Sequence, residues 1–315
     1  MRFMSRAGFA LNSGTLSIPA TANGSPFKEH SRDGLRIIRE CCENAWQDPS
    51  FGKAERDAYH AATRGELPQD TRSDILSLSC DPGYFRQFGT SFIASHHAVQ
   101  DPSVIHLHLT LPDDESIRML ERIQARLGPE RFTYTTSTSD IHHHLNYNGV
   151  YLTCARFIHT HRLMAQCGTR CVNVDIDSIV RAPIGAFLDT RLRDKDIAYI
   201  RRWTRLKVSR MVLASALVYT QSPLGLRFSD ALSRALVQIL HKGPQYHIDQ
   251  TVLYYLTVAA ARDGLRAATM GLQLADHHFA PDSPIWSAKG RKRKKNPAFL
   301  KAATGAASDF ERLMQ

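Results

Sequence analysis

Short apolar runs alternate with amphipathic segments along the middle of the chain, and this alternation limits the fold more than any other feature. The apolar runs are typical of buried strands and cover residues 75–80, 104–109, 131–136 and 170–174. The segments between them place apolar side chains at helical spacing and cover residues 84–99, 114–127 and 151–166. Strands joined by helices form right-handed β-α-β units. The pattern therefore predicts an α/β domain whose mixed, mostly parallel sheet is flanked by helices.

The remaining segments extend this domain at both ends. Further strands are expected at residues 196–201, 211–219 and 267–274, and further helices at 226–241 and 248–261. Two short helices, at 34–46 and 55–63, precede the first strand. We expect a flexible leader over 1–30, a helical accessory segment over 31–73, the α/β domain over 74–290 and a basic C-terminal tail over 291–315.

Composition limits the compartment and the partners. No run approaches the roughly 18 apolar residues of a membrane span, and six cysteines without a C-x-x-C pair fit reduced thiols in the cytoplasm. The net charge is +10, and residues 289–295 carry six positive charges. This run could contact phosphate or the inner face of an anionic membrane. Nucleic acid is disfavoured, because aromatic side chains for stacking are not interleaved with the basic ones.

Asp175 and Asp177 follow the strand that ends at residue 174. Residues i and i+2 of an extended segment point the same way, so both carboxylates can leave the strand on one side. Hard oxygen ligands of this kind suit Mn²⁺ or Mg²⁺. Asp81 follows the first strand of the domain, and ligands of such sheets bind beyond the carboxyl ends of the strands. The alternatives are a solvated strand end for the pair and a helix cap before Pro82 for Asp81.

The order of these residues resembles the GT-A glycosyltransferases, and most closely their glycosyltransferase family 8-like group. Cys80-Asp81-x-x-Tyr84 resembles the segment that holds the nucleoside, and Val174-Asp175-Ile176-Asp177 resembles the metal-binding motif. Arg156, on the helix before the acids, resembles a donor-contacting arginine. The resemblance implies a GT-A (Rossmann-like) fold for the α/β domain, which would be the catalytic domain that binds the nucleotide sugar.

Three later segments extend the resemblance. Residues 214–218 occupy the place of the family's N-S-G strand, Asp249-Gln250 resembles the D-Q pair that opens a late helix, and residues 285–290 resemble a C-terminal segment that folds over the diphosphate. Ser287 stands where the family has a metal-binding histidine, so His277 or His278 is the candidate replacement. Thr251 stands where an acid follows the D-Q pair, and Asn and Gly are missing beside Ser215.

The resemblance assigns the candidate site residues to three roles. The catalytic candidates are Asp249, Gln250 and Arg156. The candidates for donor binding are Asp81, Tyr84, Ile176, Ser215, Lys289 and Arg291. The candidate metal ligands are Asp175, Asp177, His277 and His278. Structural alternatives are a surface ion pair for Arg156, half-buried packing for Tyr84 and a helix N-terminal acid for Asp249.

The remaining charged clusters are expected to be structural. Residues 142–144 are three consecutive histidines, which cannot all converge on one ion, so we interpret them as a polar loop. Residues 293–295 are expected to be a solvated tail. The sequence also lacks the motifs G-x-x-x-x-G-K-[ST], G-x-S-x-G and G-x-G-x-x-G. Their absence argues against P-loop, α/β-hydrolase and dinucleotide-binding functions.

The function that this resemblance implies is hexosyl transfer. A hexose would move from a nucleotide sugar, with UDP as the expected nucleotide, to a hydroxyl of a glycan, a lipid-linked saccharide or a protein. The expected cofactor is Mn²⁺ or Mg²⁺, the expected outcome is retention of configuration, and polysaccharide biosynthesis is the expected process. The alternatives are an inactive GT-A-like binding or scaffold protein, for which Ser287 is the best evidence, and a nucleic-acid-associated basic protein.

Overall fold

The structure of the protein is a computed structural model that describes residues 28, 30–69, 73–138, 149–202, 204, 205, 207–244 and 248–315. The expected leader lies outside the described residues except for Lys28 and His30. The histidine run at residues 142–144 also lies outside them.

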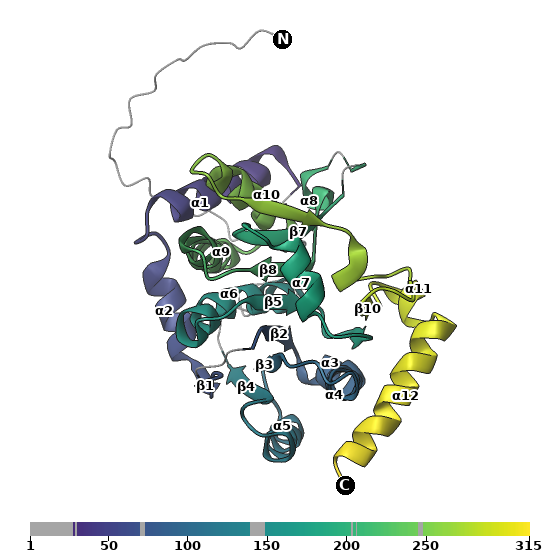
Figure 1. The fold of residues 1–315 in the computed structure, drawn as a ribbon. Coiled ribbons are helices and arrows are strands. Elements are labelled where there is room, and N and C mark those ends of the chain that lie inside the picture. The colour runs from purple at the N-terminus through teal and green to yellow at the C-terminus, as the bar shows by residue number, and fades with distance from the viewer. Residues whose placement is uncertain are drawn as a thin grey trace, which may run out of the picture.

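An eight-stranded mixed sheet forms the centre of the described part of the chain (Figure 1). Its order is β1-β4-β3-β2-β5-β8-β7-β9. The strands are β1 (Thr63–Gly65), β2 (Ile75–Cys80), β3 (Val104–Thr110), β4 (Phe132–Ser137), β5 (Cys171–Val174), β7 (Ile197–Arg201), β8 (Val212–Tyr219) and β9 (Ala267–Met270). The neighbours β4, β3, β2 and β5 are parallel, whereas β8 runs antiparallel to β5 and β7, and β1 antiparallel to β4. The predicted α/β class with a mostly parallel sheet is confirmed.

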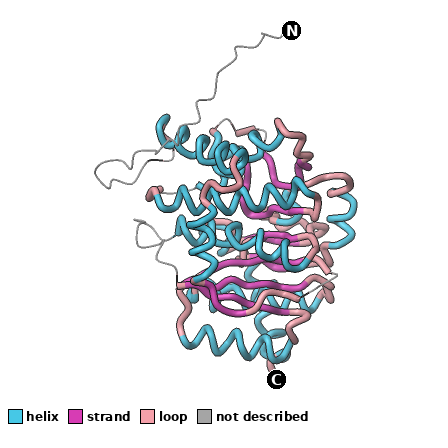
Figure 2. Tube along the Cα trace, turned by 90° about the vertical axis from the view of Figure 1, so that its left-hand side faces the viewer, coloured by secondary structure: helices cyan, strands magenta, loops and turns pink. Residues whose placement is uncertain are grey.

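Helices cover the sheet, and Figure 2 shows the strands stacked through the molecule with the helices packed around them. The longer helices are α1 (Arg32–Gln47), α2 (Lys53–Ala61), α4 (Thr90–Ala98), α5 (Asp114–Leu127), α6 (Gly149–Cys167), α7 (Gly185–Arg191), α9 (Pro223–His241), α10 (Ile248–Ala261) and α12 (Pro297–Leu313). One apolar core joins α1, α6, α9 and α10 to the sheet, and a second joins α4, α5, α7 and α12. None of the helices in the described ranges is long and apolar enough to cross a membrane.

A two-stranded ribbon, β6 (Ser178–Val180) with β10 (Ile285–Ser287), lies beside the main sheet. The two strands are antiparallel and pair Ser178 with Ser287. The backbone N–H of Ala288 then donates to the carbonyl of Asp177 at 2.8 Å. The ribbon thus brings the C-terminal segment back to the strand that follows the acid pair.

The helix predicted over residues 84–99 is divided into three parts. A single turn, α3 (Pro82–Tyr84), is followed by a π-helical turn, η1 (Phe85–Gly89), and then by α4. A Cβ atom at Gly89 would lie 2.4 Å from Cδ2 of Phe85, so the Phe85 ring packs where only glycine leaves space. The wider turn therefore accommodates Phe85, and π-turns of this kind are frequent at functional sites.

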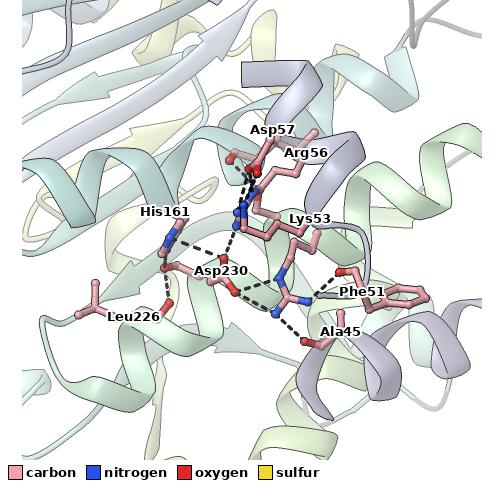
Figure 3. Close-up of polar contacts among 12 residues, drawn as sticks. Ala45, Phe51, Lys53, Arg56, Asp57, His161, Leu226 and Asp230 are labelled. Carbon is pink, nitrogen blue, oxygen red and sulfur yellow. Dashed lines mark hydrogen bonds and ion pairs between the residues drawn. The ribbon is translucent and has the colours of Figure 1, made fainter. Parts of the chain in front are cut away.

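Two accessory helices are fixed to α9 by buried charges (Figure 3). Arg234 on α9 is 2% exposed and pairs with Asp230 at 2.8 Å. It also donates at 2.7–2.9 Å to three carbonyl groups around the end of α1 and the loop that follows, those of Ala45, Asp48 and Phe51. Arg56 on α2 pairs with the same Asp230. The α1–α2 segment is therefore joined to the main core by polar contacts as well as by apolar packing.

Helix α12 lies in the segment that we expected to be a basic tail. Its first turn has Pro297, and the Asn296 side chain accepts from the Ala298 N–H at 2.9 Å, which is an N-cap. Phe299 and Phe310 are buried in the core against α4, and Ser91 on that helix donates to the Ala303 carbonyl at 3.1 Å. The last predicted strand, 267–274, is shorter than expected, since β9 ends at Met270 and the 3₁₀ turn η3 (Leu272–Leu274) follows.

Candidate active site

The candidate site lies beyond the carboxyl ends of two neighbouring parallel strands, and this end of the sheet is called its carboxyl edge below. Strand β2 pairs with β5, so Asp81 and Asp175, which follow these strands, leave the sheet at the same edge. On the other side of β5, Val174 pairs with Ala216 of the antiparallel strand β8. Ser215 therefore reaches the same edge. Its side chain is 2% exposed.

Arg156 fixes the first acid of the pair. Its Nη1 lies 2.8 Å from Oδ1 of Asp175, and its Nη2 donates to the Ala214 carbonyl at 2.8 Å. The side chains of Arg156 and Asp175 are 6% and 22% exposed. The alternative of a surface ion pair is therefore wrong, because this arginine of α6 is buried and contacts β8 and the residue that follows β5.

The second acid has a different cationic partner. Lys294 on α11 (Arg291–Lys294) places its Nζ 2.9 Å from Oδ2 of Asp177 and donates to the Tyr84 hydroxyl at 2.8 Å. The same Nζ lies 4.3 Å from the centre of the Tyr84 ring and 4.6 Å from that of Phe88. One ammonium group thus contacts both Asp177 of the acid pair and Tyr84 in the helical turn after β2, so these two residues lie side by side.

The electrostatics of the acid pair favour a bound positive charge. Burial raises the pKa of Asp177, and the negative charge of Asp175 raises it further, whereas Lys294 lowers it. Burial lowers the pKa of Lys294, but Asp177 and Tyr84 raise it above its usual value, so this lysine is protonated. Two interacting carboxylates repel each other, so a cation between or beside them is favourable.

Further charged groups interact with the acid pair. Lys289 donates to the Ser215 hydroxyl at 3.3 Å. Burial lowers the pKa of Lys289, while the charges of Asp175 and Asp249 raise it. Burial raises the pKa of Asp249, and Arg156 and Lys289 lower it. Asp249, on α10, therefore interacts electrostatically with Arg156 and Lys289.

Asp249 and Gln250 are both buried in the first turn of α10. Asp249 has one carboxylate oxygen, Oδ1, that is buried without a hydrogen-bond partner among the described residues. Gln250 accepts from Nη2 of Arg202 at 3.2 Å. Arg202 is a polar neighbour of the site that the sequence analysis did not identify, because no motif includes it.

The nucleoside candidates at the end of β2 show a structural role as well. The Asp81 side chain accepts from the Tyr84 N–H at 2.7 Å, so the structural alternative of a helix cap is confirmed. Tyr84 is 42% exposed, although the Lys294 ammonium lies over its ring. Ile176 is 4% exposed and its side chain belongs to the apolar core. The contacts of these residues with a nucleotide stay predictions.

The histidines proposed as replacement metal ligands do not complete the pair. Among the residues that the structure describes, no group of three or more His, Cys, Asp or Glu side chains is placed to hold a metal ion. His277 and His278 belong to a turn that Asp276 fixes by accepting from the His278 N–H at 2.7 Å. Burial, with the charge of Arg293 adding to it, lowers the pKa of His277 to about 4. Ser287, at the expected histidine position, is buried and its hydroxyl has no hydrogen-bond partner in the described part.

The basic run is less solvated than expected. Arg293 donates to the carbonyls of His277 and Lys289 at 3.1 and 3.3 Å, and Lys294 contacts the acid pair, whereas Lys292 and Lys295 are exposed. The expectation of a solvated tail is therefore wrong for Arg293 and Lys294. The side chain of Arg291 lies outside the described part of the structure.

A cavity of about 510 Å³ lies elsewhere, between α2 and α6. Its lining includes Arg56, His60, His161 and Arg162 but none of the predicted site residues. Arg56 and His161 both contact Asp230 (Figure 3), so part of its charge is already balanced. We therefore place the candidate active site at the carboxyl edge of the sheet.

Comparisons with known proteins bear on the fold. No protein-family model and no curated protein sequence matches this chain. Among solved structures, WbbM, a bifunctional glycosyltransferase, matches with a TM-score of 0.54 at 13% identity over 79% of this chain and 53% of its own. The glycosyltransferase GlyE of Streptococcus pneumoniae matches with a TM-score of 0.52 at 13% identity, over 77% of this chain and 64% of its own.

A third structure is matched over nearly all of its own length. An active-site mutant of LgtC matches with a TM-score of 0.51 at 14% identity over 75% of this chain and 95% of its own. By contrast, this chain spans only about half the length of the WbbM chain. The three structures share the helix-flanked, mostly parallel sheet described above. The chain therefore has the GT-A fold of the glycosyltransferases.

Proposed function

We propose that this chain is a metal-dependent hexosyltransferase of the glycosyltransferase family 8-like group. It would move a hexose from a nucleotide sugar, with UDP as the nucleotide, to a hydroxyl of a glycan, a lipid-linked saccharide or a protein. The observation that carries the proposal is the shared contact of Asp177 and Tyr84 with Lys294. It supports a single site in which a diphosphate at the acids continues into a nucleoside at the tyrosine.

The acid pair fits a hard divalent cation. Asp175 and Asp177 supply carboxylate oxygens at the end of one strand. The Lys294 ammonium group pairs with Asp177, and this contact supports a site that favours positive charge. These two residues would hold Mn²⁺ or Mg²⁺, with the remaining positions left to diphosphate and water. The bound ion supplies Lewis-acid stabilisation of the charge that grows on the leaving diphosphate.

The side chains of the chain provide the rest of the site. Arg156 keeps Asp175 oriented through two contacts with different elements, the acid itself and the Ala214 carbonyl. Lys289 is a partly buried cation beside Ser215 and adds positive charge near the diphosphate. Tyr84 would stack on the base, and Asp81 would accept from the uracil or ribose.

The sugar would lie between the acid pair and the start of α10. Asp249 has a buried carboxylate oxygen without a partner in the described part, which is available to accept from a sugar hydroxyl. Gln250 lies beside it and is oriented by Arg202. Retention of configuration follows from the family resemblance.

One observation favours the inactive scaffold as the second candidate. Ser287 replaces the histidine ligand, and no described His, Cys, Asp or Glu side chain completes the pair. The nucleic-acid alternative is weakened, because Lys289, Arg293 and Lys294 of the basic run have partners within the protein. Contact with the inner face of a cytoplasmic membrane could still use the exposed Lys292 and Lys295.

A panel of nucleotide sugars tests the proposal. A true donor stabilises the folded state by mass action, so one UDP-hexose should raise Tm in the presence of Mn²⁺ and should be hydrolysed slowly without an acceptor. The double variant Asp175→Asn/Asp177→Asn is the control and should show neither effect. Tight UDP binding without turnover of any UDP-hexose would favour the scaffold, and no Tm change with any nucleotide sugar would exclude both.

A further inference from the structure

Lys294 occupies a position that two parts of a bound donor would also need. Its Nζ lies 2.9 Å from the Asp177 carboxylate, where a divalent cation would bind, and 4.3 Å from the centre of the Tyr84 ring, where a base would stack. A hydrogen bond of 2.8 Å to the Tyr84 hydroxyl fixes this position. The side chain therefore bridges the two halves of the proposed donor site.

The two cations on the acid pair differ in how firmly they are held. Arg156 is 6% exposed and is bound both to Asp175 and to the backbone of β8. The Lys294 side chain is 21% exposed, and its Nζ makes polar contacts with Asp177 and Tyr84. Arg156 is thus a permanent partner of the pair, whereas Lys294 can be displaced.

The backbone around Lys294 allows its side chain to move without the segment. Arg293, the preceding residue, donates to the carbonyls of His277 and Lys289, which anchors α11 to the neighbouring turn. Lysine has four rotatable side-chain bonds and a compact charge. A rotation of the side chain is therefore enough to take the ammonium group away from Asp177 and from the face of Tyr84.

A divalent cation and the Lys294 ammonium cannot both lie on Asp177 at low cost. Like charges at contact distance repel each other strongly even at the effective dielectric of about 20 that applies near a protein surface. A base stacked on Tyr84 meets the same side chain on the same ring. The cation or the base, binding alone, must displace the Lys294 side chain. The ligand that binds second then does not have to displace it again.

We propose that Lys294 is a resident counter-ion that the divalent cation and the nucleoside displace together, so that each raises the affinity of the site for the other. This inference rests on the proposed function. Removal of the ammonium should therefore strengthen cation binding in the absence of nucleotide, by about tenfold, which lies within the usual range of coupling between two sites. It should also reduce the factor by which UDP increases Mn²⁺ affinity.

The test is a Mn²⁺ titration of the full chain, followed by calorimetry or by electron paramagnetic resonance, without and with UDP. Lys294→Met should bind Mn²⁺ about tenfold more tightly than the wild type without UDP. Lys295→Met is the matched control, because it removes the same charge from the adjacent, exposed residue. It should stay within about twofold of the wild type, since exposed charges are screened. Lys294→Arg, which keeps the charge, should bind Mn²⁺ as the wild type does.

The outcomes separate this inference from the proposed function. If the wild type binds Mn²⁺ and Asp177→Asn does not, but Lys294→Met binds no more tightly than the wild type, the counter-ion role is overturned and the proposed function stands. If neither the wild type nor folded Lys294→Met binds Mn²⁺ or UDP, both are overturned. Lys294→Gln repeats the test with a second neutral side chain, and circular dichroism checks that each variant is folded.

Discussion

Arg156 on α6 joins two strands of the sheet through one guanidinium group, which lies 2.8 Å from the Asp175 carboxylate on one side and 2.8 Å from the Ala214 carbonyl on the other. The planar fork of arginine suits this double contact, whereas the single ammonium of lysine does not. The pair therefore orients the first acid of the site and also ties β5 to β8.

Arg156→Met should lower the free energy of unfolding by about 3 kcal/mol, the lower end of the range for breaking a buried ion pair, because Asp175 is partly exposed. Arg156→Lys is the matched control and should lose only about 1 kcal/mol, since it keeps the charge but loses one hydrogen bond. Urea unfolding followed by fluorescence measures both. Equal losses in the two variants would show that the charge of Arg156 does not stabilise Asp175.

Arg234 should be the most sensitive position outside the site. Arg234→Met removes one of the two arginine partners of the Asp230 carboxylate, the one at 2.8 Å, and leaves the carbonyls of Ala45, Asp48 and Phe51 without this donor. We expect a loss of about 4 kcal/mol in the free energy of unfolding, because a half-buried carboxylate and three backbone carbonyls lose a partner together. Arg36→Met is the control. Arg36 pairs with Glu40 on an exposed face of α1, and its removal should change stability little. A loss at position 234 no larger than at 36 would contradict this account of how α1 and α2 are held.

Much of the fold could be predicted from the sequence because its signals are local. Strand Ile75–Cys80 and helix Asp114–Leu127 have the bounds that their apolar patterns predict. In the helix, the Asp113 side chain caps the first turn by accepting from the Ser116 N–H at 2.8 Å. Helix α12 has a comparable local signal, Asn296 before Pro297 with Phe299 and Phe310 on one face, and could have been predicted from it.

The rest of the site depends on contacts between residues far apart in the sequence. Lys294 is more than two hundred residues from Tyr84, and no property of the run RKRKK distinguishes it from Lys292 or Lys295. The antiparallel direction of β8, which places Ser215 beside Asp175, follows from the sheet order and not from the sequence of the strand. For Ser287, the apolar residues around it in the sequence predict that the side chain is buried. They do not predict that its hydroxyl has no hydrogen-bond partner among the described residues.

Buried histidines should make the fold sensitive to acid. His106 and His108 are 0% and 1% exposed, and their rings contact the hydroxyls of Thr133, Thr135 and Ser137 on β4. Burial, with the charge of Arg162 adding to it, lowers the pKa of His106 to about 3. In the unfolded chain histidine takes a proton below about pH 6.5, so the unfolded state binds more protons between pH 6.5 and 3.

Stability should therefore fall as the pH drops below 6.5, by about 1.4 kcal/mol per pH unit for each such histidine. Urea unfolding at several pH values between 7 and 4.5 measures the slope. His106→Gln should make this slope less steep, by the contribution of one histidine. An unchanged slope in His106→Gln would contradict the assignment of the acid sensitivity to this residue.

Asp249 allows binding and chemistry to be separated. Asp249→Asn keeps the shape of a buried side chain whose Oδ1 has no partner in the described part of the chain, so the fold should be retained. We expect hydrolysis of the donor to fall by about 100-fold or more, in line with the loss of a positioned acid–base or hydrogen-bonding group. The affinity for UDP with Mn²⁺ should stay within about twofold, because the proposed nucleotide contacts lie at Tyr84 and the acid pair. Loss of UDP binding to the same extent as turnover would assign Asp249 a structural role instead.

The central claim is that Asp175 and Asp177 form a divalent cation site that binds the diphosphate of a nucleotide. Calorimetric titration of UDP into the full chain, with Mn²⁺ and with a chelator, tests it most directly, using the wild type and Asp175→Asn/Asp177→Asn. The account predicts that UDP binds the wild type only with Mn²⁺ and does not bind the double variant in either condition. Equal UDP affinity with and without metal, or unchanged affinity in the double variant, would contradict it.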